Sequence, residues 1–404
     1  MGKYYRITPE GTRDLIFEEC TLRRKLEEQM KKLFRSRGFS EVVTPEIEFL
    51  DVFTLTHHAI SEESMYKLSD RKGRLIALRP DSTMPIARLV STRLKDQPLP
   101  IRLFYNQKVY HATPSLTGKS DEELQSGIEI IGVSGKRADL EALSMAVEVL
   151  ENCNSSNYRL EIGHIAIFNR LMKKLNIDDE LKEEIRLVIE RKNYPALNDL
   201  VDSRLSAENA AQIKQLPRLF GGDEIFDKAI NLFKDSEITE TIEYLRSLYN
   251  ALQRLGLGEK ISVDLGIVNR INYYTGVIFR GYISGFGRAV LSGGRYDNLF
   301  AEFGMPNPAI GFGINLDAVL ASLLENKRIC SGCETELLVY AAEGYEMDGL
   351  VYLKQQTEKG IVTEYSVFDS LDRSLSYAKN KEIPRVAVVA DHVEIIMTKD
   401  GENQ

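Results

Sequence analysis

The sequence has few cysteines and no apolar run long enough to cross a bilayer. Its 404 residues include four cysteines, Cys20, Cys153, Cys330 and Cys333, which are too few and too scattered for a disulfide-stabilised secreted fold. The first residues also show no basic segment followed by an apolar one, so nothing indicates secretion or membrane insertion. We therefore expect a cytoplasmic protein.

Metal ligands are scarce as well. The one suggestive spacing is Cys330-Ser-Gly-Cys333, but the five histidines supply no second pair of ligands at a spacing that zinc would require. We interpret these two thiols as loop residues, and we predict neither a metal nor a cofactor. The adjacent His57 and His58 are interpreted as solvated polar residues.

The composition also lacks an excess of basic residues. The formal net charge is -8 and 43% of the residues are hydrophobic, so the chain can bury a large core but has no broad positive field. Tight, sequence-independent binding of nucleic acid normally needs such a field. The length favours two or three domains.

The first part of the chain mixes helical and extended patterns. Apolar residues recur at helical spacing over residues 22–34, which predicts an amphipathic helix. Strands are predicted at residues 39–43, 65–68, 74–78, 101–111, 123–132 and 158–162, with helices from residue 85 and over 139–150. Side chains alternate along a strand, so Gln125, Gly127 and Glu129 should share one face.

A helical insertion and a glycine-rich hairpin follow. Residues 164–258 show helical periodicity throughout, and the segment 263–300 alternates apolar and polar residues. The alternation lies on both sides of a group of small residues, Gly281, Ser284, Gly285 and Gly287. This pattern predicts an antiparallel hairpin. Two glycines before Arg295 and Tyr296 would let a ligand approach closely, although an ordinary turn between core strands would look the same.

The C-terminal region reads as a separate small domain. Short strands are predicted at residues 337–342, 361–367, 386–390 and 393–397, with helices over 348–359 and 370–380. We predict an α/β domain over residues 335–404. Residues 1–326 are predicted to form an α+β domain, in which helices flank a mainly antiparallel sheet and which includes the insertion.

Seven motifs occur in order along the first domain. They are Pro9-Glu-Gly-Thr-Arg-Asp14, Thr44-Pro45, Leu78-Arg-Pro-Asp-Ser-Thr83, the segment Arg102 to Glu129, Asn269-Arg-Ile-Asn-Tyr-Tyr274, Ser292-Gly-Gly-Arg-Tyr-Asp297 and Gly311-Phe-Gly-Ile-Asn-Leu-Asp317. With these motifs the first 325 or so residues resemble the catalytic core of histidyl-tRNA synthetase. The resemblance implies a class II aminoacyl-tRNA synthetase-like fold, and it implies a homodimer formed through the first of the class II motifs.

The departures from that family concern cations. Adenylate chemistry brings a carboxylate onto the α-phosphate of ATP and needs fixed positive charge. Where the family has arginines, this sequence has Tyr110, Asn269 and Ala318, and Ala112 replaces an acidic residue. Arg270 is one position late and would face the other side of a strand. Three losses in one site favour a chain without catalytic residues.

The residues that match the family's histidine pocket are retained. They are Asp81, Thr83, Gln125, Glu129, Tyr274 and Tyr296, with Asp81 standing where glutamate is usual. The resemblance therefore implies a histidine-like pocket without an adenylation site. Alternatively, these polar groups only hydrogen-bond one another beneath a vestigial sheet.

The C-terminal domain resembles the anticodon-binding domain of the same enzymes. It is shorter than usual and lacks a clear basic patch, which fits a chain that does not bind tRNA.

A synthetase-like chain of this kind resembles the regulatory subunits of ATP phosphoribosyltransferase. That family implies a hetero-oligomer with a short catalytic subunit, a role in the first step of histidine biosynthesis, and feedback by histidine as effector. Two alternatives stay open at this point. One is a divergent histidine-tRNA ligase, and the other is a synthetase-like regulator of a different target.

Overall fold

The computed structural model describes residues 3–55, 60–113, 120–153, 157–268, 273–325 and 335–398. The chain divides into two compact units, residues 1–327 and 328–404. None of the helices within these described ranges is long and apolar enough to span a membrane. The motif residues Asn269 and Arg270, the pair His57 and His58, and the pair Cys330 and Cys333 lie outside the described residues.

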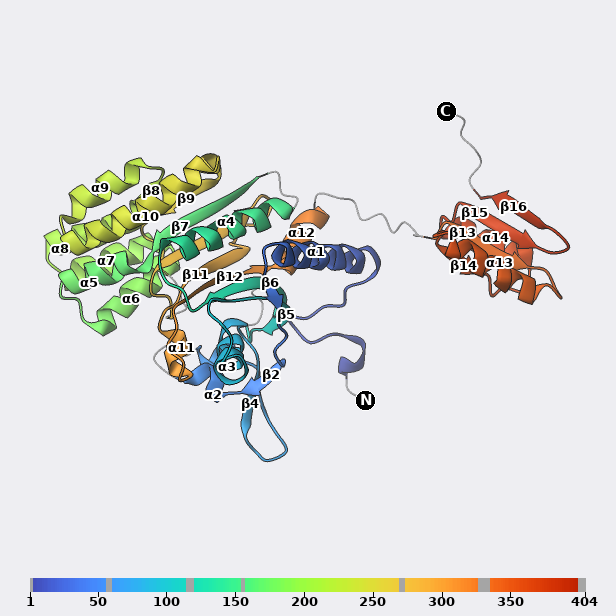
Figure 1. The fold of residues 1–404 in the computed structure, drawn as a ribbon, viewed down its shortest axis with the longest axis horizontal. Helices are drawn as coiled ribbons and strands as arrows, with labels where there is room; N and C mark the ends of the chain where they lie inside the picture. Colours follow the sequence, from blue (N-terminus) through green and yellow to red (C-terminus); the bar gives the residue numbers. More distant parts are fainter. Residues whose placement is uncertain are drawn as a thin grey trace. The chain divides into compact units, whose positions relative to one another are not determined.

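The first unit is built on a nine-stranded sheet (Figure 1). Its strands are β1 (Ser40–Glu41), β5 (Ile101–Tyr110), β6 (Glu122–Ile131), β12 (Ala309–Asn315), β11 (Leu291–Arg295), β10 (Val277–Ile283), β7 (Tyr158–His164), β9 (Ile261–Asp264) and β8 (Phe220–Gly221), in that spatial order. All neighbours are antiparallel except the pairs β1–β5 and β7–β9. The α+β architecture predicted from the sequence is confirmed.

Helices cover one face of this sheet. They are α1 (Phe17–Ser36), α4 (Lys136–Asn152) and α12 (Leu316–Glu325), and the insertion adds α5 (Ile165–Lys174), α6 (Asp179–Glu190), α7 (Tyr194–Arg204), α8 (Ala207–Gln215), α9 (Glu224–Phe233) and α10 (Ser236–Arg254). Figure 1 shows α4 crossing the strands and the insertion helices grouped at one end. Met30, Phe104, Leu143, Phe168 and Leu245 belong to one continuous core on this side.

The opposite face carries a second, smaller core. It includes α2 (Asp51–Thr54), α3 (Thr83–Arg93), α11 (Leu299–Glu302) and a three-stranded antiparallel sheet of β2 (Ile47–Phe49), β4 (Leu75–Leu78) and β3 (Lys67–Ser69). Leu103 and Tyr105 of β5 belong to this core, whereas Phe104 between them belongs to the other. The period of two along the strand explains the division.

The small sheet leaves an apolar face exposed. In β2 the buried residue is Glu48, which pairs with Arg88 at 2.6 Å, whereas Ile47 and Phe49 are 51% and 44% exposed. Leu68 of β3, on the same face, is 48% exposed. In most half-buried strands the polar side chains face outward, and here the order is reversed. Apolar side chains are therefore partly exposed.

The predicted hairpin is formed by β10 and β11. Gly281, which the sequence pattern placed at the bend, instead lies inside β10, paired with Leu291. Its missing side chain has another cause, because a Cβ there would come within 2.8 Å of the Leu150 side chain of α4. The glycine therefore permits close packing of helix against sheet.

The helical prediction for the insertion is largely correct. Four of its helices begin at a polar residue, Asp178, Asn193, Ser206 or Asp235, whose side chain accepts a backbone N–H three residues later. Such caps satisfy the free donors at a helix N-terminus. The periodicity did not reveal β8, which pairs with β9 and extends the sheet.

The second unit is a four-stranded sheet between two helices. Its elements are β13 (Leu337–Ala341), α13 (Glu346–Glu358), β14 (Thr363–Tyr365), α14 (Leu371–Asn380), β15 (Arg385–Val389) and β16 (Val393–Met397). The strand order is β14-β13-β15-β16, with β16 the one antiparallel member. Leu353 packs with Val339 on one face, and Ala378 packs with Leu338 on the other.

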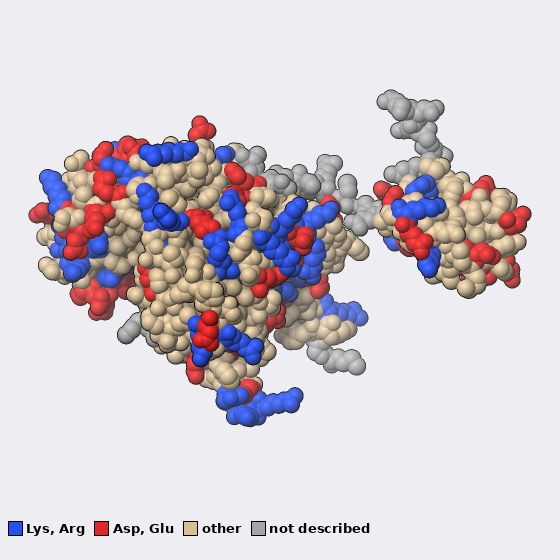
Figure 2. Space-filling view, viewed as in Figure 1, with Lys and Arg blue, Asp and Glu red and all other residues tan. Residues whose placement is uncertain are grey.

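Charge on the visible surface is mixed. Basic and acidic side chains lie interspersed over most of the face shown in Figure 2. This distribution agrees with the net negative composition.

Candidate functional site

The candidate pocket lies on the sheet face opposite α4, where β6, β12 and β11 run side by side. Glu129 of β6 is paired with Gly311 of β12, and Gly311 is paired with Gly294 of β11. Directly paired residues in an antiparallel sheet point to the same face. The strands therefore place one carboxylate next to two positions that have no side chain.

Glycines keep this part of the sheet open. A Cβ on Gly311 would overlap the carboxylate of Glu129, and a Cβ on Gly294 would come within 2.8 Å of the Tyr274 ring. A Cβ on Gly313 would come within 2.8 Å of the Gln125 amide carbon. Any larger residue would displace a pocket side chain.

Glu129 is the most enclosed charged group of the pocket, at 1% exposure. Thr83 donates a hydrogen bond to one carboxylate oxygen at 3.0 Å, and the Tyr296 hydroxyl donates to the other. Burial raises the pKa of Glu129 to about 8, opposed by these two hydrogen bonds and reinforced by the nearby Asp81. Burial therefore favours the protonated form of Glu129.

Asp81 stands at the start of α3, beside Thr83. It accepts a hydrogen bond from the Met84 backbone N–H at 2.7 Å and a longer one from the Tyr273 hydroxyl at 3.4 Å. Loss of hydration raises its pKa to about 6, although these hydrogen bonds stabilise the charged form. Two carboxyl groups thus share one weakly hydrated site.

Tyrosines enclose the two carboxyl groups. The Tyr273 ring lies 5.0 Å from that of Tyr274 and 5.4 Å from that of Tyr296, centroid to centroid. Across the pocket, the Tyr105 hydroxyl donates to the Gln125 side-chain oxygen at 3.2 Å. The structure therefore brings together all six residues predicted from the sequence and adds Tyr105 and Tyr273.

The two added tyrosines carried weak sequence signals. Tyr273 is adjacent to Tyr274 in the same motif. Tyr105 lies two residues after Leu103 in β5, so both side chains are on the same face of the strand. Its position is set by pairing with Gly127 on the adjacent strand β6. Only the register of the strands shows that Tyr105 borders the pocket.

The pocket offers acceptors and hydroxyls but no neighbouring cation in direct contact. In the described part of the chain, the hydrogen-bond partners of Glu129 and Asp81 are hydroxyls and a backbone N–H, and no lysine or arginine pairs with either. Such a site favours a cationic ligand with several N–H donors. Across the same ranges, no group of three or more His, Cys, Asp or Glu side chains could hold a metal ion.

Two of the three positions where the synthetase resemblance calls for arginine lie within the described residues. Tyr110 ends β5, and partial burial together with Glu46 raises its pKa to about 12. Ala318 lies in the first turn of α12, where its backbone N–H is bonded to the Asn315 side chain at 2.9 Å. Neither side chain carries positive charge.

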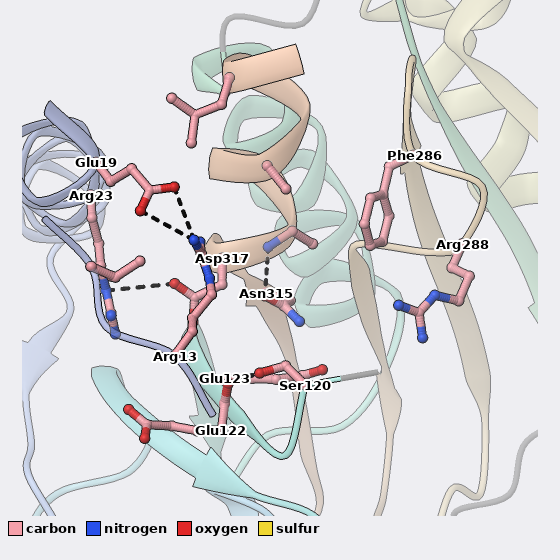
Figure 3. A pocket seen from close by; sticks show the side chains of 14 residues that line it. Arg13, Glu19, Arg23, Ser120, Glu122, Glu123, Phe286, Arg288, Asn315 and Asp317 are labelled. Carbon is pink, nitrogen blue, oxygen red and sulfur yellow. Dashed lines mark hydrogen bonds and ion pairs between the residues drawn. The ribbon is translucent and has the colours of Figure 1, made fainter. Parts of the chain in front are cut away.

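A separate cavity of about 320 Å³ adjoins Ala318 (Figure 3). Arg13 reaches it and pairs with Glu19 at 2.9 Å, while Arg23 lies 3.6 Å from Asp317. Dashed lines in Figure 3 mark these two contacts and the hydrogen bond between Ala318 and Asn315. Carboxylates of the same chain thus pair with Arg13 and Arg23, whereas Arg288, which also lines the cavity, lies over the Phe286 ring.

Neither cysteine in the described ranges, Cys20 or Cys153, indicates a second functional site. Cys153 is buried, and burial raises the pKa of its thiol to about 12, which makes it a poor nucleophile. Cys20 is exposed on α1.

Comparisons with known proteins identify the family of the chain. A family model described as histidyl-tRNA synthetase matches residues 11–319. An ATP phosphoribosyltransferase regulatory subunit from Clostridium kluyveri is 40% identical over 386 residues, covering 95% of this chain and 99% of the relative. A protein of the same name from Bacillus cereus is 38% identical over 393 residues, covering 96% and 92%.

Solved structures show the same fold. A crystal structure from Bacillus halodurans, described as an ATP phosphoribosyltransferase regulatory subunit/histidyl-tRNA synthetase, matches with a TM-score of 0.82 at 28% identity, covering 93% of this chain and 97% of that one. A histidyl-tRNA synthetase from Nostoc sp. matches with a TM-score of 0.79 at 19% identity, covering 98% and 97%. The second likeness concerns the fold alone. The synthetase-like fold predicted from the sequence is confirmed.

Replacing Glu129 with glutamine should stabilise the ligand-free chain at high pH. A carboxyl group whose folded-state pKa is raised contributes stability below the unfolded value, and this stability is lost as the pH rises through the folded value. For Glu129, this loss of stability takes place between about pH 4 and 8. We expect Glu129→Gln to raise the free energy of unfolding by about 1–3 kcal/mol at pH 8 and to have little effect at pH 4.

Thermal unfolding at the two pH values measures this difference. Glu259→Gln, which changes an exposed glutamate of the same unit, serves as the control and should be neutral at both. An equal effect of Glu129→Gln at pH 4 and pH 8 would show that the carboxyl group is not held protonated.

Replacing Gly311 with alanine should destabilise the first unit, because the new methyl group takes the place of the Glu129 carboxylate. Such overpacking typically costs about 1–3 kcal/mol. Gly287 has open space around its Cβ position, so Gly287→Ala is the matched control. Urea unfolding compares the two variants, and equal midpoints would contradict the described position of Glu129.

Proposed function

Because the chain belongs to the histidyl-tRNA synthetase family and, within it, to the ATP phosphoribosyltransferase regulatory subunits, we propose that it regulates ATP phosphoribosyltransferase without catalysing a reaction itself. In this role it assembles with a short catalytic subunit. It serves the first step of histidine biosynthesis and its feedback regulation by histidine.

The observation that carries this proposal is the enclosed pair of carboxyl groups. Histidine offers an ammonium group and a ring N–H, and Asp81 and Glu129 can accept hydrogen bonds from both. Gln125 and Thr83 add polar contacts, and Tyr274 and Tyr296 flank the ring. A histidine site of this kind lets the chain respond to the end product of the pathway.

The loss of fixed cations supports a non-catalytic role. Removing one electrostatic contact to the developing charge in an active site costs roughly 2.7–4 kcal/mol of transition-state stabilisation. Tyr110 and Ala318 provide no such contact, and Asn269 provides none by its chemistry. A chain that binds histidine but cannot activate it can act only through a partner.

We further propose that two copies of the chain associate through the region of the first class II motif, which comprises α1 and Thr44-Pro45 and leads directly into β2 of the small sheet. Ile47, Phe49 and Leu68 present an apolar face that is about half exposed, with the Arg74 guanidinium 4.6 Å from the centroid of the Phe49 ring. Burying such a face is favourable, and self-complementary surfaces produce symmetric dimers. The catalytic subunit then binds elsewhere on the molecule.

The proposal predicts that feedback can be separated from assembly. We expect the chain to co-purify with a short ATP phosphoribosyltransferase catalytic subunit and to increase its activity. The double variant Gln125→Ala with Glu129→Ala should leave both properties intact but weaken inhibition by L-histidine about 10-fold or more, because the pocket loses two ligand contacts. Initial rates of the reconstituted complex over a histidine series measure the effect.

Gln253→Ala with Glu259→Ala makes the same chemical change on the exposed end of the insertion and serves as the control. Unchanged inhibition in the pocket variant would place the effector on the catalytic subunit. Failure of the wild-type chain to associate would contradict the proposed function itself.

A further inference from the structure

One row of paired residues connects the pocket to a cation that the synthetase motifs do not include. Successive strand pairings place six residues side by side across the sheet, in the order Tyr105, Gly127, Gly313, Ser292, Arg280 and Glu161. Directly paired residues of antiparallel strands share a face. Arg280 of β10 therefore lies on the same face as the pocket.

Between the pocket and Arg280, the row is bordered by the side chains of Tyr105 and Gln125, which lie over Gly127 and Gly313. Gly127 and Gly313 have no side chains, and Ser292 is small and exposed. Neighbouring strands are about 4.8 Å apart, so Arg280 lies about 10 Å from Gly313 across two strand spacings. A small amino acid held at Glu129 and Asp81, together with the long arginine side chain, can span that gap.

The guanidinium group of Arg280 has donors to spare. It donates hydrogen bonds to the backbone carbonyl of Val268 and to the Tyr282 hydroxyl, and arginine has five N–H donors in total. Arg280 is half-buried, and Glu161 lies directly opposite it on β7. The other side chains near it include Tyr282 and Asp264.

The positive charge of Arg280 also affects the pKa of a pocket residue, Tyr274. The pKa of Tyr274 is raised by burial first and then by Glu129 and Asp81, while Arg280 opposes these effects. Its positive charge is therefore felt at the tyrosine that borders both carboxyl groups. This supports the proximity that the strand register indicates.

We propose that Arg280 binds the carboxylate of the amino acid whose ammonium group and ring are held by Asp81 and Glu129. The inference rests on the proposed function and deepens it, since it gives the pocket a contact for each charged end of a zwitterion. Without an anion-binding group, the carboxylate-rich pocket would accept an amine such as histamine as readily as histidine. Arg280 makes the pocket specific for the amino acid.

A purely structural role would act through Val268. Arg280 holds the carbonyl of this residue, which directly precedes the segment that leads to Tyr273 and Tyr274. If Arg280 served only to position that segment, its loss would weaken every pocket ligand equally. Ligands with and without a carboxylate distinguish the two roles.

The test is calorimetric titration of the full chain with L-histidine and with histamine, which lacks the carboxylate. We expect Arg280→Met to weaken L-histidine binding about 10- to 100-fold, the loss typical of one charge-assisted hydrogen-bond contact, and to change histamine binding less than about 2-fold. Arg159→Met removes an exposed cation from the adjacent strand β7 and should leave both ligands unaffected. Thermal unfolding verifies that each variant is folded.

Equal weakening of both ligands by Arg280→Met, or no weakening of either, would overturn the assignment of Arg280 to the carboxylate. A matching loss of histidine affinity in Arg159→Met would also overturn it, since the effect would then reflect overall charge. If the wild-type chain bound histamine and L-histidine equally well, the pocket would stand and the role of Arg280 would fall. If it bound neither, the proposed histidine pocket would fail as well.

Discussion

A carboxyl group buried without a cation is the constraint on which the functional part of this molecule depends. Glu129 is almost completely enclosed and is held by two hydroxyl groups, from Thr83 and Tyr296. Its position requires glycine at residue 311, because any side chain there would occupy the same space. Burying such a group lowers stability unless its partners compensate. The strand pairing, the glycines and the tyrosines all serve to keep this one group in place.

The same arrangement explains how a synthetase-like fold can bind without reacting. Binding an ammonium group and a ring requires acceptors, whereas transfer to a phosphate requires fixed positive charge. Asp81 and Glu129 provide the former, and Tyr110 and Ala318 do not provide the latter. In the cavity beside Ala318, Arg13 and Arg23 face carboxylates of their own chain.

Much of this could be predicted from the sequence, because alternation within one strand is a local property. The pattern around Gln125 and Glu129 placed both on one face of β6, and the alternation on either side of the glycine-rich bend predicted the β10–β11 hairpin. The contributions of Tyr105 and Arg280 could not be predicted in this way. Their places beside the pocket depend on how the β5–β6 and β10–β11 pairs are joined through β12 and β7, and the pairings β6–β12 and β7–β10 connect strands that are far apart in the chain. Gly281 was misplaced for the same reason, since its role is to admit Leu150 from a distant helix.

The central claim is that this chain itself holds a histidine site, independent of any catalytic partner. Equilibrium dialysis of the purified full chain against labelled L-histidine tests it most directly. The account predicts saturable binding of one histidine per chain in the absence of the catalytic subunit. Absence of saturable binding to the chain alone, with binding restored only when the catalytic subunit is present, would contradict it.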